Sequence, residues 1–148
     1  MIKFVDGDLL QSDAECLVNP VNCVGVMGKG LAYQFKLKYP NMYKDYIKTC
    51  KSLKISVGKI HHYKEKGKII VNLPTKKHWR EKSTLEYVMS GLYALLTFIA
   101  EYDIKSIAIP ALGCGCGGLE WEIIKEGMLK VLNQMDKDIN VYIYNPIN

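Results

Sequence analysis

Two glycine-rich segments of this sequence have the composition of phosphate-binding loops. The first covers residues 25–30 (GVMGKG) and precedes a predicted helix, and the second covers residues 113–118 (GCGCGG), between a predicted buried strand and a predicted helix. Backbone N–H groups at a helix N-terminus bind phosphate, and glycine has no side chain to obstruct its approach. Taken alone, the first segment fits an ordinary turn equally well. Two such loops at the carboxyl ends of strands in one open α/β sheet favour a crevice that holds one diphosphate ligand.

Neither segment matches a standard nucleotide-binding motif. A Walker A loop would require glycine at position 23 and serine or threonine at position 30, where this chain has Cys23 and Gly30. Residues 113–118 fit the letters of G-x-G-x-x-G, but a Rossmann fingerprint opens a domain, and here only one helix and one strand are predicted to follow. Because no serine or threonine is placed to hold Mg²⁺, the pattern favours a nucleotide that is bound over a phosphoryl group that is transferred.

Polar side chains follow two of the predicted strands. Asn19 and Asn22 stand at the entry to the first glycine segment, where amides bind sugar hydroxyls or form turns. Residues 74–80 (PTKKHWR) combine cations, an imidazole and an indole. A solvated basic loop is the ordinary interpretation of this composition. Trp79 beside Arg80 also favours stacking with a nucleobase.

The cysteines and histidines predict neither disulfides nor a metal site. The cysteines are odd in number and no secretory signal precedes the first predicted strand, so we expect reduced thiols at Cys16, Cys23, Cys50, Cys114 and Cys116. The three histidines and the cysteines lack the spacing of a zinc site, and His61 and His62 should point to opposite faces of a strand. A nucleophilic cysteine is an alternative for which the sequence offers no evident base.

Hydrophobic periodicity predicts one α/β domain over residues 1–148. Apolar runs and alternation predict strands at residues 3–5, 15–18, 57–63, 69–73, 106–109 and 140–144. Helical spacing predicts helices at residues 31–39, 41–51, 83–101 and 120–134, the third of them with a capping box formed by Ser83 and Glu86. The charged connection at residues 64–68 has the length of a hairpin loop, so its two strands should pair antiparallel in a mixed, mostly parallel sheet.

The composition excludes disordered, collagen-like and membrane-spanning proteins. Of the 148 residues, 49% are hydrophobic and 24% are charged, with 12 glycines and 5 prolines. No apolar stretch approaches the roughly 20 residues of a bilayer helix. The formal net charge of +5 favours a polyanionic partner, although such a charge is common among soluble domains. We expect a cytoplasmic monomer that makes no contact with membranes.

Four short motifs, in this order, resemble those of the macrodomain family. They are GDL at residues 7–9, VNPVN at 18–22, MGKGLA at 27–32 and PALGCG at 110–115, and the resemblance extends over essentially the whole chain. It implies a three-layer α/β/α sandwich with a central mixed sheet. Residues 74–80 and 117–121 (GGLEW) look most like the DarG antitoxin branch, which consists of DNA ADP-ribosyl glycohydrolases that reverse a DarT-type toxin.

The resemblance implies roles for individual residues. Asp8 would read the adenine amino group beside the Leu9 backbone, Asn22 would contact the distal ribose, and Lys76 would be the catalytic lysine. The other implied ADP-ribose contacts are Asn19, Met27, Gly28, Lys29, Gly30, Leu31, Thr75, Gly113, Cys114, Gly115, Cys116, Gly117 and Gly118. The residues implied to face the modified base and the DNA are Lys77, His78, Trp79 and Arg80. No metal or cofactor is implied, and ADP-ribose is the ligand and product.

The activity implied by the resemblance is removal of ADP-ribose from a thymine or guanine in single-stranded DNA. Lys76 would attack the anomeric carbon or its ring-opened form, or would protonate the leaving base. Related hydrolases that act on protein carboxylates carry an aspartate where this chain has Gly117, which disfavours a protein substrate. The alternatives are a module that only binds ADP-ribose and a hydrolase that acts on protein or on a small ADP-ribose metabolite.

Overall fold

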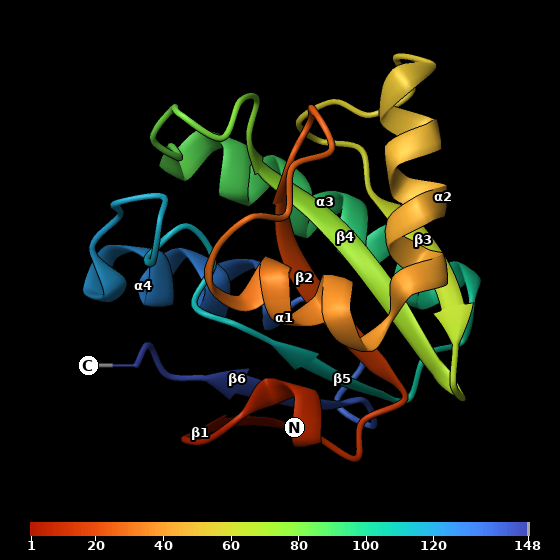
Figure 1. The fold of residues 1–148 in the computed structure, drawn as a ribbon. Coiled ribbons are helices and arrows are strands. Elements are labelled where there is room, and N and C mark those ends of the chain that lie inside the picture. The colour runs from red at the N-terminus through yellow and green to blue at the C-terminus, as the bar shows by residue number, and fades with distance from the viewer. Residues whose placement is uncertain (148) are drawn as a thin grey trace.

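A six-stranded sheet forms the centre of the computed structural model, which describes residues 1–147 (Figure 1). Across the sheet the strands follow the order β1 (Ile2–Val5), β6 (Asn140–Tyr144), β5 (Ser106–Ile109), β2 (Cys16–Asn22), β4 (Lys68–Lys76) and β3 (His61–Glu65). Neighbouring strands are parallel except β3 and β4, which pair antiparallel. The mixed, mostly parallel sheet expected from the sequence is confirmed, and the five parallel strands have their carboxyl ends at the same end of the sheet.

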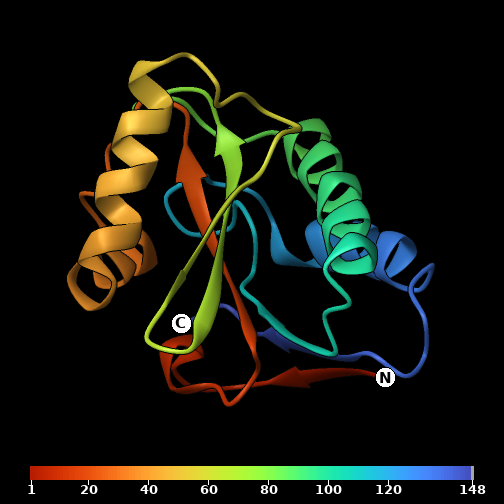
Figure 2. The ribbon, with the colours of Figure 1, turned by 90° about the vertical axis from the view of Figure 1, so that its right-hand side faces the viewer.

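Helices cover both faces of this sheet. The helices α1 (Gly30–Lys38) and α2 (Pro40–Lys51) lie on one face together with the 3-10 turn η1 (Leu9–Gln11), and α3 (Leu85–Glu101) and α4 (Trp121–Leu132) lie on the other (Figure 2). The three-layer α/β/α sandwich is therefore confirmed. Within residues 1–147, the structure contains no helix that is both long enough and apolar enough to cross a bilayer.

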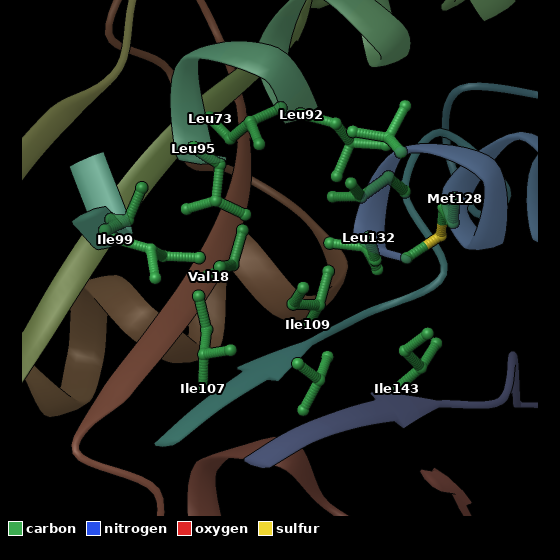
Figure 3. Packing of buried hydrophobic residues seen from close by; sticks show 14 of the residues in the cluster. Val18, Leu73, Leu92, Leu95, Ile99, Ile107, Ile109, Met128, Leu132 and Ile143 are labelled. Carbon is green, nitrogen blue, oxygen red and sulfur yellow. The ribbon is translucent and has the colours of Figure 1, made fainter. Parts of the chain in front are cut away.

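Alternating side chains of β2 contribute to two separate hydrophobic clusters. Val18 points toward α3 and α4, and Leu17 points toward α1 and α2, as expected for a strand that is buried on both faces. Figure 3 shows the cluster under α3 and α4, in which Val18 lies among aliphatic side chains of the neighbouring strands and helices. The packing of α3 on β4 is so close that a Cβ at Gly91 would stand 2.5 Å from Cδ2 of Leu73.

The end of β4 differs from the prediction, which stopped this strand at residue 73. Pro74 is buried and continues the strand, and β4 pairs with β2 until Lys76 lies opposite Asn22. A proline lacks the N–H of a sheet ladder, but β3 pairs with β4 only as far as Asn72, so no strand on that side requires a donor from Pro74. Pairing with β2 therefore positions Lys76 as a strand residue.

The hairpin between β3 and β4 is shorter than predicted. Its turn consists of Lys66 and Gly67 alone, with φ angles of 52° and 77°. Two successive positive φ angles are typical of a type I′ turn, which favours glycine at its second position. The strand β3 begins at His61, so the predicted strand start at residue 57 is wrong, and the antiparallel pairing is confirmed.

The helix α3 is capped by a different residue from the one predicted. Thr84 is the N-cap, and its hydroxyl accepts a hydrogen bond from the backbone N–H of Tyr87 at 3.1 Å. The predicted capping box of Ser83 and Glu86 is wrong because Ser83 is buried against the loop after β5. The helices α1, α2 and α4 and the strands β1, β5 and β6 agree with the predicted segments to within about two residues at each end.

Candidate active site

The loops that follow β2, β4 and β5 are joined by backbone hydrogen bonds at the carboxyl ends of these strands. The N–H of Cys23, directly after β2, donates to the carbonyl of Lys77 at 3.1 Å, and the N–H of Ser83 donates to the carbonyl of Gly117 at 3.0 Å. The segment of residues 77–84 is thus bonded to both glycine loops. The structure brings together three of the segments that the sequence assigned to one site.

Asn22 holds the first glycine loop in shape. Its Oδ1 accepts hydrogen bonds from the N–H groups of Val24 at 3.1 Å and Val26 at 3.3 Å, and its Nδ2 donates to the carbonyl of Val26 at 2.7 Å. The hydroxyl of Tyr46 in α2 donates to the carbonyl of Asn22 itself. The contact between Asn22 and a ribose stays a prediction, and it would use the second N–H of the amide.

The helix α1 begins directly after this loop with an uncapped N-terminus. Lys29 occupies the N-cap position and makes no side-chain hydrogen bond to the first turn, and Gly28, Lys29 and Gly30 are exposed. Unpaired N–H groups at the start of a nine-residue helix are suited to bind an anion. Met27 is buried and Leu31 is half-buried, so these two predicted contact residues pack against the core beneath the loop.

The glycines of the second loop fall into two kinds. Gly113 has a φ of 75°, and a Cβ at Gly117 would stand 2.4 Å from Oγ of Ser83 and 2.5 Å from the carbonyl oxygen of Gly113. These two glycines are required by the packing of the loop, and an aspartate at position 117 has no room. Gly115 and Gly118 are exposed, and a Cβ at Gly115 would meet no atom of residues 1–147 within 4 Å.

Lys76 stands at the end of β4, opposite Asn22 in the register of β2 and β4. Its side chain is half-buried, and its Nζ donates a hydrogen bond to the carbonyl of Trp79 at 3.2 Å. Thr75, the preceding residue, is buried, as are the residues of β4 from Ile70 to Pro74. The amine therefore lies against the basic segment that follows β4, and the backbone of Lys76 lies next to the end of β2, where the first glycine loop begins.

An aromatic and cationic stack follows Lys76. The side chain of Trp79 is 44% exposed, and the guanidinium of Arg80 lies 4.6 Å from the centre of its ring system. The imidazole of His78 stacks on Trp79 at 5.4 Å and accepts a hydrogen bond from the backbone N–H of Arg80 at 3.1 Å. Lys77 is exposed, with its amine 5.7 Å from the ring of Tyr87. The indole is therefore at the surface and not in the core.

Asp8 lies after β1, three strands away from β2. One oxygen of its carboxylate accepts a hydrogen bond from the N–H of Leu10 at 3.0 Å at the start of η1, and the residue is exposed, whereas Leu9 is buried. β1 and β4 are four strand spacings apart, which corresponds to about 19 Å across the sheet. A ligand that touches both Asp8 and Lys76 must therefore be elongated, and the two glycine loops lie between its ends.

Asn19 is fully buried beneath the first glycine loop, with its Nδ2 3.7 Å from Sδ of Met27. Its Nδ2 donates to Oδ1 of Asn72 at 2.9 Å, and Nδ2 of Asn72 donates to Nδ1 of His61 at 3.0 Å. With Nδ1 accepting, Nε2 of His61 carries the proton and donates to Asp45 in α2 at 2.7 Å. This buried polar chain connects the middle of the sheet with α2, the helix that also carries Tyr46. Sequence analysis missed it, although an amide at position 72 within an apolar run was a signal.

Burial makes two of the cysteines near the loops, Cys23 and Cys114, poor nucleophiles. Burial raises the pKa of the Cys114 thiol to about 11, so this thiol is protonated at neutral pH. Burial, and secondarily the neighbouring Cys50, also raises the pKa of Cys23, which donates to the carbonyl of Lys76. Cys116 is exposed. Among residues 1–147, no group of three or more His, Cys, Asp or Glu side chains is arranged to hold a metal ion.

Comparison with known families identifies the architecture. The family model for the macro domain matches residues 18–128, which include both glycine loops and the segment of residues 77–84. The chain belongs to the macro domain family. This macrodomain is 46% identical to a DNA ADP-ribosyl glycohydrolase of Mycobacterium tuberculosis and 43% identical to one of Thermus aquaticus, each over 99% of this chain. The chain spans 42% of the length of these two relatives.

Solved structures agree with this assignment. The macrodomain of Mycobacterium tuberculosis DarG superposes with a TM-score of 0.96 at 46% identity, covering 99% of both chains. A structure of Thermosipho africanus DarTG in complex with ADP-ribose gives a TM-score of 0.92 at 36% identity, covering 99% of this macrodomain and 42% of that chain. The fold implied by the sequence motifs is thereby confirmed at high similarity.

Proposed function

We propose that this macrodomain is a DNA ADP-ribosyl glycohydrolase, which hydrolyses the N-glycosidic bond between ADP-ribose and a thymine or guanine base. Lys76 acts at the anomeric carbon, and no metal takes part. ADP-ribose lies along the carboxyl ends of the strands, with the adenine near Asp8, the diphosphate between the two glycine loops and the distal ribose near Asn22. The modified base and its single strand lie against residues 77–80.

The observation that carries this proposal is the position of the Lys76 amine. The amine is held 3.2 Å from the carbonyl of Trp79, whose indole is exposed and can stack on a base, and the backbone of Lys76 pairs with Asn22 in the strand register. A side chain in this position is within reach of a bond that joins a ribose on one side to a base on the other. The names of the relatives at 43% and 46% identity support the same substrate class.

In the reaction, the C–N bond between C1 of the distal ribose and the base breaks, and a water molecule supplies a hydroxyl to C1 and a proton to the base. As an ammonium, Lys76 would protonate the departing base. As a neutral amine, it would attack C1 directly or in its ring-opened form, and water would then release ADP-ribose from the lysine. The hydrogen bond to Trp79 keeps the amine on the side of the base, which favours the first role.

A specific observation disfavours a protein substrate. The acid that the related carboxylate-directed hydrolases carry in the second glycine loop would have to stand at Gly117, where a Cβ already meets Ser83 and Gly113 at 2.4 Å and 2.5 Å. The loop of this chain therefore leaves no space for that acid. Lys76 is the remaining candidate for acid or nucleophile at the distal ribose.

The deciding measurement is release of ADP-ribose from a single-stranded oligonucleotide that carries one ADP-ribosylated base, with EDTA present throughout. We expect rapid release by the wild type and a loss of about 100-fold or more in Lys76→Ala, with ADP-ribose binding retained. Lys76→Arg keeps the positive charge but gives up a proton far less readily, so it should also be inactive. Lys130→Ala, on the exposed surface of α4, is the matched control and should have the activity of the wild type.

Tight ADP-ribose binding without any release would contradict the proposal and leave a module that only binds ADP-ribose. Full activity of Lys76→Ala would contradict the proposed role of the lysine, but the proposed substrate class would still stand. Comparing thymine-linked with guanine-linked substrates identifies the base.

We also propose that a DNA ADP-ribosyl transferase of the DarT type is the functional partner. A relative from Thermosipho africanus, 35% identical over 96% of this chain, is by name a fusion of a DNA ADP-ribosyl transferase with a DNA ADP-ribosyl glycohydrolase. A hydrolase of this bond restores the DNA that such a transferase modifies. Co-expression of the macrodomain should relieve the toxicity of a DarT-type transferase, and co-expression of Lys76→Ala should not relieve it by catalysis.

A further inference from the structure

A lysine-rich segment that none of the assigned roles uses follows the middle of α2. Residues 46–64 contain no aspartate or glutamate, and their five lysines are Lys48, Lys51, Lys54, Lys59 and Lys64. Lys51, Lys54 and Lys59 are exposed. In the part of the chain that the structure describes, the ion pairs are His61 with Asp45 and Lys105 with Asp103, so these three lysines carry unneutralised charge.

The segment crosses the end of the molecule that carries the candidate site. Residues 52–60 run from α2 toward α3, at the same end as the loops after β2 and β4 in both views (Figures 1 and 2). A Cβ at Gly25 would lie 3.7 Å from Cβ of Cys50, and a Cβ at Gly58 would lie 3.6 Å from Cβ of Ser90 in α3. The segment is therefore packed between the first glycine loop and α3 and does not extend freely into solvent.

Direct contacts join this segment to the residues that would face the base. Cys23 lies next to Cys50 and to the backbone of Val57, and its own backbone N–H donates to the carbonyl of Lys77. Lys77, Arg80 and Lys82, which follow β4, are exposed as well, so both segments carry positive charge at the same end of the molecule (Figures 1 and 2). Glu81 is the single acidic residue between Glu65 and Glu86.

We propose that Lys51, Lys54 and Lys59 bind the phosphodiester backbone of single-stranded DNA next to the nucleotide whose base is modified. Together they form what we call the lysine strip. Exposed cations at the end of the molecule that also carries an exposed indole match the chemistry of a single strand, which offers phosphates to the cations and an unpaired base to Trp79. An acidic polypeptide would satisfy the charges but would leave the indole without a stacking partner. The proposal rests on the proposed function only in assigning the strip to substrate recognition.

The binding test uses an unmodified, labelled 20-nucleotide thymidine oligonucleotide, whose fluorescence anisotropy is measured against NaCl concentration. We expect the triple variant Lys51→Gln, Lys54→Gln, Lys59→Gln to bind more weakly than the wild type at low salt. Each lost phosphate contact should reduce the slope of log affinity against log salt by about 0.7, or by about 2 in total. The matched control replaces Lys3, Lys130 and Lys137 with glutamine, because these are also exposed lysines and lie outside the strip.

An affinity and salt slope of the triple variant equal to those of the wild type would overturn the proposal. It would also be overturned if duplex DNA or polyglutamate competed as well as the single strand. Circular dichroism and thermal unfolding of each variant show whether the fold is retained, and the three single lysine variants give the same comparison if the triple variant is unstable.

Hydrolysis assays separate failure of the strip from failure of the enzyme. With a long ADP-ribosylated oligonucleotide, the triple variant should show an increased KM and an unchanged kcat. With an ADP-ribosylated mononucleotide, which has no flanking phosphates, it should match the wild type. If neither substrate is hydrolysed by the wild type, the proposed function fails, and the anisotropy measurement still decides whether the strip binds single-stranded DNA.

Discussion

Lys76 and Trp79 are coupled through one hydrogen bond, from the amine of the first to the carbonyl of the second. In the proposed reaction the amine acts from beside this carbonyl, so the conformation of residues 77–80 would set both the surface on which a base stacks and the direction of the amine. One short segment would then contribute to base recognition and to the position of the acting group.

The two kinds of glycine in the second loop give a prediction at the scale of single residues. Gly115→Ala should leave thermal stability unchanged, because the added Cβ meets nothing within 4 Å in residues 1–147, and should weaken ADP-ribose binding by about tenfold or more through contact with the diphosphate. Gly117→Ala should lower the free energy of unfolding by about 1–3 kcal/mol, because its Cβ collides with Ser83 and Gly113. Thermal unfolding and calorimetric titration with ADP-ribose measure both effects.

Gly117→Ala serves as the control for Gly115→Ala. A loss of ADP-ribose affinity that comes from damage to the loop should be accompanied by a loss of stability, whereas a loss that comes from obstruction of the ligand should not. Wild-type ADP-ribose affinity in Gly115→Ala would show that this part of the loop does not surround the diphosphate. Unchanged stability in Gly117→Ala would show that the loop relaxes and would reopen position 117 to an acid.

At the scale of elements, the end of α2 contains a residue with an unfavourable backbone conformation. Leu53 follows the C-cap Ser52 with a φ of 58°, and its side chain is 91% exposed, so it contributes little packing. Left-handed backbone costs an L-residue with a side chain about 1 kcal/mol relative to glycine. Leu53→Gly should therefore stabilise the protein by about 0.5–1 kcal/mol, as measured by urea unfolding.

The control for this prediction is Leu37→Gly, which replaces a leucine that is also exposed but has helical backbone in the last turn of α1. Glycine should destabilise the helix there, by up to about 1 kcal/mol. A loss of stability in both variants would mean that Leu53 makes contacts in solution that its exposure does not reveal.

Elements with strong periodicity were predictable from the sequence, and elements that depend on long-range contacts were not. The helix α2 and the strands β5 and β6 have apolar patterns that specify one state. By contrast, Pro74 was interpreted as a strand end, because proline has no backbone N–H to donate to a neighbouring strand. A local pattern does not reveal that β3 stops pairing with β4 at Asn72, so that no such donor is needed at position 74. Ser83 was assigned the cap of α3 for the same reason, since its burial against Gly117 arises from a loop more than thirty positions away.

The candidate site was predicted from the sequence only in part. The glycine loops and residues 76–80 were singled out, and they meet in the fold. The buried chain from Asn19 through Asn72 and His61 to Asp45 was not predicted, because its members come from four separate elements, β2, β4, β3 and α2, and only the amide at position 72 stands out in its own segment. Pairing between distant elements is visible only once strand order and register are known.

At the scale of the whole molecule, strand order sets the length of the site. The order β1-β6-β5-β2-β4 spreads Asp8 and Lys76 across about 19 Å and puts the loops after β5 and β2 between them. Cys23 connects this line to the segment that carries the lysine strip, because it donates to the carbonyl of Lys77 and lies next to Cys50 and Val57. One elongated ligand and the strand attached to it can therefore follow a continuous path, with the nucleotide over the sheet and the DNA beyond β4.

His62, on the outer strand β3, should make the free energy of unfolding depend on pH. The imidazole of His62 packs against Phe98 in α3 at 4.9 Å and against Tyr102, the C-cap residue of α3, at 5.0 Å. Although His62 remains exposed on its other side, partial burial lowers its pKa, the neighbouring His61 lowers it further, and Asp45 acts in the opposite direction. The folded state therefore binds a proton at this site less readily than the unfolded chain, whose histidine pKa is about 6.5.

Because the unfolded chain takes up the proton first, the free energy of unfolding should decrease as the pH falls below about 6.5, until the folded protein is protonated as well. His62→Phe keeps an aromatic contact with α3 but cannot titrate, so its stability should decrease less than that of the wild type between pH 7.5 and pH 5. Urea unfolding at several pH values measures the difference. His78→Phe, which alters the histidine beside Trp79 instead, should retain the pH dependence of the wild type. If the free energies of unfolding of the wild type and His62→Phe decrease equally between pH 7.5 and pH 5, protonation of other groups, and not of His62, weakens the fold in acid.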